Sequence, residues 1–294
     1  MALPGLKLWL LAARPKTLWA AISPVIIGTA FAVDDGGFHA LSAFLALFGA
    51  VMIQIGTNFA NDYHDYKKGA DTKERKGPVR VTQAGLIKPE TVKKAYLIVF
   101  LFALLSGLYL VYRGGIPILT IGLLSILFGI LYTAGPFPLG YHGLGEIFVL
   151  IFFGPVAVGG TYYVQTLEIT RSVLIAGLAP GLISTAILTV NNLRDIETDK
   201  KTGKRTLAVR FGIKFARIEY LLTMVSAFLI PPAVFLLTKE NLYTVISSAM
   251  LLAAVPVIRE VFIESDGEKL NMVLARTGKL LLLFSIIFSI TLQF

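Results

Sequence analysis

Long apolar stretches alternate with short polar connections along the whole chain. Nine of them are long enough, or nearly so, to cross a bilayer, which takes roughly 20 residues of helix. Lipid offers no partner to unpaired backbone groups, so each stretch is predicted to be a helix. Barrel strands are excluded because they are short and alternate in polarity. The predicted spans are residues 17–33, 38–60, 93–112, 116–134, 144–164, 172–192, 217–237, 241–258 and 276–293.

The composition agrees with this pattern. Hydrophobic residues make up 55% of the 294 positions, charged residues make up 15%, and the mean hydropathy is +0.75. Soluble domains typically have about 25% charged residues. The sequence therefore predicts an all-α, multi-pass membrane protein, and residues 1–294 are expected to form one integral-membrane domain. The chain has no cysteine and three histidines, which excludes thiolate chemistry and argues against a histidine-built metal site.

The positive charge is concentrated on one side of the predicted spans. The formal net charge of +9 could indicate a nucleic-acid partner. However, 24 of the 27 Lys and Arg residues fall in segments on the same side as the N-terminus, and 3 fall in the opposite loops. In membrane proteins, the segments with such an excess of Lys and Arg face the cytoplasm. We therefore expect a cell-membrane protein with a cytoplasmic N-terminus, and no nucleic-acid partner is needed.

The N-terminal segment also has features of a secretory signal peptide. Its positively charged residues precede an apolar run that ends in AFA at residues 30–32, a plausible cleavage pattern. Eight further spans follow, and the positive segment carries apolar residues of its own. We therefore expect a retained first span, preceded by a short helix on the inner membrane surface.

Two predicted cytoplasmic loops carry carboxylates in a repeated pattern. Each loop starts inside the end of an even-numbered span with an asparagine and two aspartates spaced by three or four residues, so the three side chains share one helical face. The two sets lie four spans apart, which indicates a weak internal repeat whose acidic faces meet across a cavity. The sets are Asn58, Asp62 and Asp65 in the first loop, and Asn191, Asp195 and Asp199 in the second.

The four aspartates predict a metal site. Carboxylates near hydrocarbon are costly and tend to mark function, and carboxylates on one helical face repel each other. A bound cation would relieve both costs. Because all-oxygen ligands favour Mg²⁺, Mn²⁺ or Ca²⁺ over zinc, Asp62, Asp65, Asp195 and Asp199 are predicted to bind Mg²⁺ and to take part in catalysis.

Positive and amide side chains accompany both aspartate sets. Carboxylates beside cations fit a phosphate that is held partly by metal and partly by Lys or Arg. A substrate that also stays in the membrane would be a prenyl diphosphate, and aromatic rings could stabilise the allylic cation that it forms. Tyr132 is the best-placed such ring. The predicted substrate-binding residues are Asn58, Asn61, Lys67, Lys68, Arg80, Asn191, Asn192, Arg194 and Lys204. Taken singly, Lys67 and Lys68 are explained at least as well by a solvated helix end.

Several segments resemble one known family. NDYHDYKKGAD at residues 61–71, followed by GPVRVTQAGLI, and NNLRDIETDKKTGKRTLAVRFG from residue 191 resemble the two aspartate-rich motifs of the UbiA superfamily of intramembrane prenyltransferases. RPKTLW at residues 14–19 and YTAGPFPLGYHGLGE at residues 132–146 are also similar to that family. The resemblance covers nearly the whole chain and is strongest to the branch that acts on 1,4-dihydroxy-2-naphthoate.

The resemblance implies a helical bundle around a central cavity that cytoplasmic loops cap. It also implies Mg²⁺-dependent transfer of a polyprenyl group to an aromatic acceptor, with release of diphosphate. In the naphthoate branch, which serves menaquinone biosynthesis, the prenyl group replaces the ring carboxylate, which leaves as CO₂. Arg14, Lys16 and His142 are candidates to bind that carboxylate, and His142 could equally have a plain interfacial role.

The motif match extends to single residues. Asn61, Asp62 and Asp65 match the first motif, and Asp195 and Asp199 match the second. The broader superfamily often has a further aspartate where this chain has Gly69, and Asp71 follows two residues later, as in the naphthoate branch.

Two alternatives remain open at this point. Another acceptor of the same superfamily is possible, such as 4-hydroxybenzoate, a porphyrin or a glycerol phosphate lipid. A secondary transporter could also combine helical repeats with intramembrane charge. However, transporter sites usually lie near the bilayer midplane, whereas these aspartates all lie at the inner ends of their spans.

Overall fold

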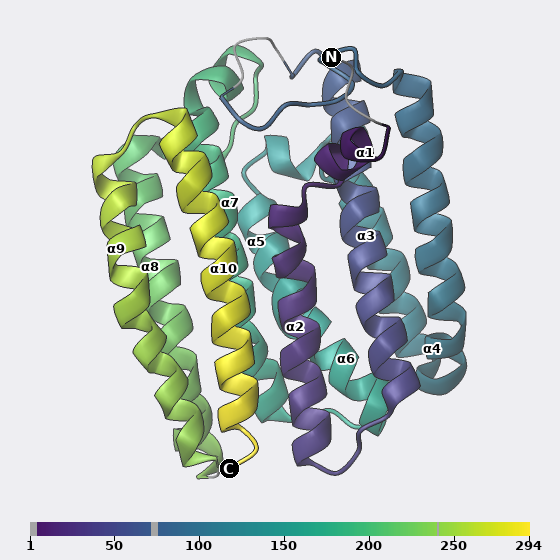
Figure 1. Cartoon of the computed structure of the whole chain (residues 1–294), viewed down its shortest axis with the longest axis vertical. Coiled ribbons are helices and arrows are strands. Elements are labelled where there is room, and N and C mark those ends of the chain that lie inside the picture. Colours follow the sequence, from purple (N-terminus) through teal and green to yellow (C-terminus); the bar gives the residue numbers. More distant parts are fainter. Residues whose placement is uncertain (1–4, 72–75, 240) are drawn as a thin grey trace.

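A computed structural model describes residues 5–71, 76–239 and 241–294. These residues form a bundle of long, roughly parallel and antiparallel helices, and none of them forms a strand (Figure 1). The chain belongs to the all-α class, as the sequence predicts. The elements are α1 (Gly5–Ala13), α2 (Pro15–Asp34), α3 (Ala40–Lys67), α4 (Pro89–Leu131), η1 (Leu139–Tyr141), α5 (Gly145–Ile151), η2 (Phe152–Val156), α6 (Ala157–Thr166), α7 (Arg171–Lys201), α8 (Leu207–Thr238), η3 (Leu242–Ala249), α9 (Met250–Ile263) and α10 (Gly267–Thr291).

The described residues contain eight helical segments long and apolar enough to cross a membrane. One of them, α4, covers two of the predicted spans, because Gly115 breaks it with φ of 66° and ψ of −152°. Such a positive φ carries little cost in glycine. Both ends of α4 approach the same end of α3: Lys67 lies 3.8 Å from Glu90, and Thr133 bonds to Asn61. The chain therefore turns back at Gly115, which gives the nine predicted crossings.

Span five is continuous in space but irregular in its backbone. It consists of α5, the π-helical segment η2 and α6, with Pro155 inside η2 and non-helical dihedrals at Gly154. Glycines let this span approach α7 closely: a Cβ on Gly181 would lie 2.5 Å from the carbonyl oxygen of Leu150. This contact fixes α7, which carries the second aspartate pair, against the fifth span.

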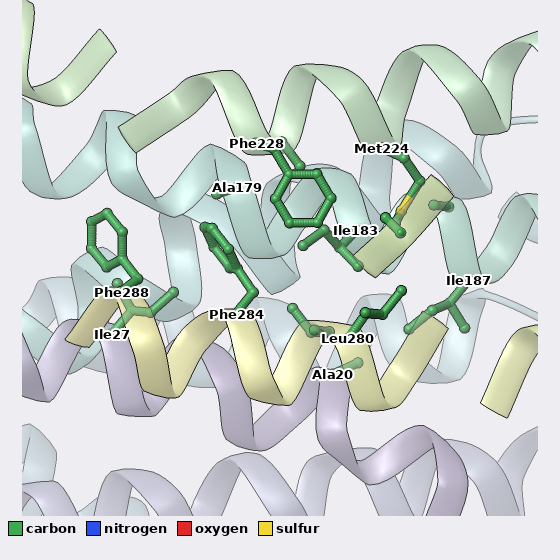
Figure 2. Packing of buried hydrophobic residues seen from close by; sticks show 14 of the residues in the cluster. Ala20, Ile27, Ala179, Ile183, Ile187, Met224, Phe228, Leu280, Phe284 and Phe288 are labelled. Carbon is green, nitrogen blue, oxygen red and sulfur yellow. The ribbon is translucent and has the colours of Figure 1, made fainter. Parts of the chain in front are cut away.

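The main hydrophobic core lies between α2, α7, α8 and α10 (Figure 2). Phe228 and Phe284 meet edge to face, with ring centroids 5.5 Å apart. Ile27 and Ile183 are fully buried in the same cluster. Inside a bilayer, van der Waals packing of this kind, and not removal from water, holds helices together. The core therefore fixes α7 against α2, α8 and α10.

The N-terminus forms a separate short helix, α1, ahead of the first span. A second core cluster joins α1 to α3 and α4, and in it the ring of Trp9 lies 5.4 Å from that of Phe59. Leu6 and Leu10 remain 74% and 51% exposed. Arg14 separates α1 from α2 with a left-handed backbone (φ 51°). The structure thus contains the short helix that the sequence predicts before the first span.

Candidate active site

Two neighbouring cavities lie inside the bundle. The polar cavity has a volume of about 180 Å³ and lies among the polar loops. The apolar cavity, of about 610 Å³, is formed by α2 to α6 and η2. The polar cavity is lined by Arg14, Thr17, Asp65, Arg80, Thr133, Tyr141, Asn191, Asn192, Asp195, Asp199, Lys204 and Thr206, among others. Six residues line both cavities and form the junction between them: Ala20, Gln54, Asn61, Tyr132, Val149 and Phe153.

The two aspartate-rich motifs meet at the polar cavity. Helices α3 and α7 continue to Lys67 and Lys201, so the aspartates keep the helical spacing that places them on one face. The Nζ of Lys204 lies 3.5 Å from Oδ2 of Asp65 and 3.9 Å from Oδ1 of Asp199. The structure confirms the predicted approach of the two acidic faces across a cavity.

Arg80 is a buried cation of the first polar loop. Its Nη2 lies 3.2 Å from Oδ2 of Asp65, and its Nε lies 3.4 Å from Oδ2 of Asp71. Its Nη1 is buried and has no hydrogen-bond partner among the described residues. Because Arg80 also lines the polar cavity, this nitrogen is a candidate donor for an anionic ligand.

Arg194 contacts the second motif itself. Its Nε and Nη2 donate to the two carboxylate oxygens of Asp195 at 2.9 and 2.5 Å. Nη2 also donates to Asn191, and Nη1 donates to Asn271 of α10. Asn271 in turn donates to the carbonyl oxygen of Lys76 in the first loop. Arg194 is absent from the cavity lining, so it positions Asp195 and Asn191 and ties them to α10.

Asp62 differs from the other three predicted ligands. Its two carboxylate oxygens accept the backbone N–H groups of Thr82 and Val81, each at 3.1 Å. The residue is 1% exposed, and it does not line either cavity. The sequence-based assignment of Asp62 as a metal ligand therefore rests on its motif position and not on these contacts.

The predicted asparagines separate into two groups. Asn61, Asn191 and Asn192 line the polar cavity. Asn61 accepts a hydrogen bond from Thr133, and Asn192 donates to the buried Glu146. Asn58 lines only the apolar cavity. Its Nδ2 donates to the carbonyl oxygen of Ala13 and to Thr17, which joins α3 to the turn between α1 and α2.

Of the other predicted basic residues, one lines the polar cavity and three do not. Arg14 lines the polar cavity. Lys16, Lys67 and Lys68 do not line it: Lys16 is exposed, Lys67 approaches Glu90, and Nζ of Lys68 donates to the carbonyl oxygen of Gly135. The solvated helix end, which the sequence left open for single lysines, describes Lys67 best.

Tyr141 completes the polar cavity and was missed from the sequence. Its hydroxyl donates to Oδ1 of Asp65 at 2.6 Å. Two ammonium groups approach its ring: Nζ of Lys204 lies 4.7 Å from the ring centroid, and Nζ of Lys68 lies 5.2 Å from it. Burial, followed by the negative charge of Asp65, raises the pKa of Tyr141 far above its usual value, so its hydroxyl stays protonated. The signal for Tyr141 lay in the stretch at residues 132–146, where the sequence singled out Tyr132 and His142 but not Tyr141.

Tyr132 lies where the two cavities join. Two glycines make room for its side chain. A Cβ on Gly140 would lie 2.8 Å from its ring, and one on Gly145 would lie 2.9 Å from its hydroxyl. The predicted position of an aromatic ring beside the polar site is thus met, with the ring held by close glycine contacts.

The donor set of the polar cavity suits a hard divalent cation. Its acidic lining residues are Asp65, Asp195 and Asp199, and Mg²⁺ is typically held by one or two carboxylates together with substrate phosphates. Within the described ranges, no three His, Asp, Glu or Cys side chains are already gathered as a metal-binding group. The residues therefore fit a Mg²⁺ ion that shares its coordination with a phosphate, and do not form a complete protein cage.

The protein is a bundle of membrane-type helices, and its acid-lined polar cavity lies beside an apolar one. These features define a class of integral-membrane proteins that bind molecules with a charged group on a hydrophobic chain. The chain matches the UbiA prenyltransferase family over residues 21–285 and belongs to that family. It is therefore a multi-pass membrane protein.

The chain is similar to several curated proteins over almost its full length. It is 40% identical over 289 residues to the 1,4-dihydroxy-2-naphthoate octaprenyltransferase of Escherichia coli, covering 95% of this chain and 93% of that protein. It is 37% identical over 295 residues to the protein of the same name from Haemophilus influenzae, covering 97% and 95%. The protein of that name from Mycobacterium tuberculosis is 37% identical, with 95% and 94% covered.

Solved structures share the fold. A UbiA homologue from Archaeoglobus fulgidus, bound to GPP and Mg²⁺, superposes with a TM-score of 0.73 at 16% identity, covering 98% of this chain and all of that one. A UbiA homologue from Aeropyrum pernix K1 superposes with a TM-score of 0.69 at 15% identity, covering 95% and 97%. At these identities the likeness shows the helical architecture.

Proposed function

We propose that this protein transfers a polyprenyl group from a prenyl diphosphate to 1,4-dihydroxy-2-naphthoate, with Mg²⁺ as cofactor, in menaquinone biosynthesis. Diphosphate and CO₂ are the other products. The acceptor assignment is supported by the names of relatives that are 37–40% identical over nearly the whole chain. The use of Mg²⁺ is supported by the oxygen donors of the polar cavity, and also by the ion bound in the A. fulgidus homologue.

One observation carries the proposal: the polar cavity and the apolar cavity share a junction of six residues. A prenyl diphosphate has the same division into a charged head and a hydrocarbon tail. The head fits among Asp65, Asp199, Arg80 and Lys204, and the tail fits between the apolar helices. The C1–O bond that must break then lies at the junction.

The chemistry follows from this placement. The C1–O bond breaks, and its electron pair leaves with the diphosphate. A new bond forms between prenyl C1 and the ring carbon that carries the carboxylate. The bond from that ring carbon to the carboxylate then breaks, its electron pair restores the aromatic ring, and CO₂ departs. No net proton is gained or lost.

Each group of residues has a stated part in this proposal. Asp65, Asp195 and Asp199 would hold Mg²⁺, which when bound supplies positive charge to the leaving diphosphate. Arg80 and Lys204 bind the remaining phosphate oxygens, since charge-assisted hydrogen bonds to phosphate are strong. The rings of Tyr132 and Phe153 face the developing allylic cation and exclude the water that would quench it.

The side of the membrane is part of the proposal. Of the 27 Lys and Arg residues, 17 lie in residues 61–94 and 194–217. Positive residues concentrate in cytoplasmic loops. We therefore propose that the polar cavity and the N-terminus lie at the cytoplasmic face of the cell membrane, where a soluble aromatic acid can enter.

The proposal is tested with the purified full-length protein in detergent. It is incubated with Mg²⁺, a labelled prenyl diphosphate and a panel of aromatic acids that includes 1,4-dihydroxy-2-naphthoate and 4-hydroxybenzoate. Mass spectrometry identifies the lipid product. Prenylated naphthoquinol is the expected product, and prenylated 4-hydroxybenzoate alone would contradict the acceptor assignment.

A further inference from the structure

We infer that the junction of the two cavities is the binding site for the acceptor ring, and that Gln54 is its specificity-determining residue. This inference rests on the proposed function, since it identifies where the second substrate of that reaction binds. The ligand class is a hydroxylated aromatic acid, and Gln54 is assigned to one of its ring hydroxyls.

Gln54 is an amide in the middle of a membrane span. Helix α3 runs from Ala40 to Lys67, and its apolar part has a mean hydropathy of 1.9. Among the described residues, Gln54 makes no hydrogen bond, while it lines both cavities. The side chain is half-buried, so its amide is open to the cavity space. Polar residues within spans accordingly face a cavity or a ligand.

The position of the reacting atoms places the acceptor beside Gln54. Prenyl C1 joins the diphosphate to the hydrocarbon, so it lies where the polar cavity meets the apolar one. The acceptor carbon must approach C1 to form a bond, and its ring therefore occupies the same junction. Ala20, Val149 and Phe153 supply apolar walls there.

Only two of the six junction residues carry an amide. Asn61 already accepts a hydrogen bond from Thr133 through its Oδ1, at 2.9 Å. Of the two amide oxygens at the junction, that of Gln54 is thus the one that accepts no hydrogen bond from the described residues. A ring hydroxyl is a donor of matching chemistry.

Acceptor analogues that lack one hydroxyl test this inference. A site built around a substrate hydroxyl discriminates against analogues without it, because its polar group is then left unpaired. We compare kcat/KM for 1,4-dihydroxy-2-naphthoate with values for 1-hydroxy- and 4-hydroxy-2-naphthoate, in wild-type protein, Gln54→Leu and Gln54→Met. Thr57→Val is the matched control, since Thr57 lies one turn along α3 and lines the apolar cavity only.

In both Gln54 variants, the ratio of kcat/KM for the full substrate to kcat/KM for one of the two analogues should fall about tenfold, the value of one hydrogen bond. KM for the prenyl diphosphate should stay within twofold, and Thr57→Val should discriminate as wild type does. Unchanged discrimination in both Gln54 variants would overturn the inference. Wild-type protein that prenylates none of these naphthoates would overturn the proposed function instead.

A separate observation concerns Asp62, which the structure assigns as a positioning residue for Arg80. Its carboxylate binds two consecutive backbone N–H groups, those of Val81 and Thr82, directly after Arg80 in the chain. Arg80 itself lies 3.2 Å from Asp65. Asp62 therefore acts on the polar cavity through the loop that it holds.

The loop that Asp62 holds is a compact turn. The N–H of Ala84 donates to the carbonyl oxygen of Arg80 at 2.9 Å, and the N–H of Leu86 donates to that of Val81 at 2.9 Å. Val81 is fully buried in the cluster around α1, α3 and α4. A buried carboxylate that accepts two backbone N–H groups makes charge-assisted bonds, roughly twice as strong as neutral ones.

Comparing Asp62→Asn with Asp65→Asn separates a positioning residue from a metal ligand. An asparagine offers one acceptor oxygen, and its amide group faces the second N–H without bonding to it. Asp62→Asn should raise KM for the prenyl diphosphate about tenfold and speed amide exchange at Val81 and Thr82. It should leave the Mg²⁺ concentration for half-maximal activity within twofold, whereas Asp65→Asn should raise that concentration.

Amide exchange of the wild-type protein provides a check that needs no variant. The Val81 and Thr82 amides should be protected both with and without Mg²⁺. Fast exchange of these two amides would overturn the inference. So would an Asp62→Asn variant whose Mg²⁺ requirement rises as much as that of Asp65→Asn.

Discussion

The ammonium nitrogen of Lys204 lies 3.5 Å from a carboxylate oxygen of Asp65, so a cation of the second polar loop reaches an acid of the first. The same nitrogen lies 3.9 Å from Asp199. The Lys204 side chain is 12% exposed, and salt screens a partly buried pair less than an exposed one. A positive charge is thereby held between two carboxylates on opposite sides of the polar cavity.

Replacing Lys204 should change metal and substrate binding in opposite directions. In Lys204→Met, no ammonium competes for the carboxylates, so Mn²⁺ should bind about fivefold more tightly in the absence of substrate, the effect of about 1 kcal/mol. KM for the prenyl diphosphate should rise at least tenfold, since a phosphate contact is lost. Mn²⁺ binding is measured by electron paramagnetic resonance of the purified protein. Weaker Mn²⁺ binding in Lys204→Met would contradict this account. Lys67→Met serves as the control, because the Lys67 side chain is half exposed, and it should bind Mn²⁺ as wild type does.

The second motif should be essential to turnover while leaving the fold intact. Asp195→Asn and Asp199→Asn each remove a negative charge from the cavity lining. Activity should fall at least 100-fold, since replacing even a residue that only orients a metal ligand typically costs about 10- to 100-fold. Circular dichroism should show unchanged helix content. Glu168→Gln, an exposed site at the other end of the bundle, should keep full activity, and near-normal turnover in either aspartate variant would refute the assigned role.

Removal of the Tyr141 hydroxyl should weaken catalysis without abolishing it. A hydrogen bond to a charged group contributes about 1.5–3 kcal/mol, so Tyr141→Phe should lower kcat/KM roughly tenfold or more. Because the pKa of Tyr141 is raised, its hydroxyl stays protonated where an ordinary tyrosine ionises, at about pH 10. The ratio of wild-type to variant activity should therefore stay constant as the pH rises toward that value. A ratio that collapses in this range would contradict the assigned donor role; Tyr243→Phe, at an exposed tyrosine, should leave activity unchanged.

Much of this arrangement could be predicted from the sequence, because local rules determine it. Apolar runs of about 20 residues define the spans, and spacings of three and four residues place carboxylates on one helical face. That was sufficient to bring Asp65, Asp195 and Asp199 to one site. The break at Gly115 was also visible, as a short polar interruption between two apolar runs.

Tertiary contacts decide what the sequence left undetermined. Asp62 lies on the same helical face as Asp65, so the sequence does not distinguish the two. Only the fold of residues 80–87 shows that the Asp62 carboxylate accepts the backbone N–H groups of Val81 and Thr82. Arg194 likewise belongs to the motif, yet its guanidinium turns to Asp195. Tyr141 carries no periodicity of its own, since it lies in a connection between two spans.

The orientation in the membrane is open to direct test because the chain has no native cysteine. Two single-cysteine variants, Lys200→Cys and Lys239→Cys, probe the two ends of the bundle. Lys200 lies in the last turn of α7, and Lys239 directly follows α8, which runs back to the opposite end. In intact cells, a membrane-impermeant maleimide should label the Lys239→Cys protein, and should label the Lys200→Cys protein only after permeabilisation. Labelling of the Lys200→Cys protein in intact cells would contradict the proposed topology.

The fate of the acceptor carboxylate tests the proposed reaction most directly. Purified protein is given Mg²⁺, a prenyl diphosphate and 1,4-dihydroxy-2-naphthoate labelled with ¹⁴C in its carboxyl group, and the lipid product, diphosphate and gaseous label are measured together. The account predicts one diphosphate and one labelled CO₂ for each prenylated ring, with no label in the lipid. Prenylated product that keeps the label would contradict substitution at the carboxylate-bearing carbon, and with it the proposed reaction.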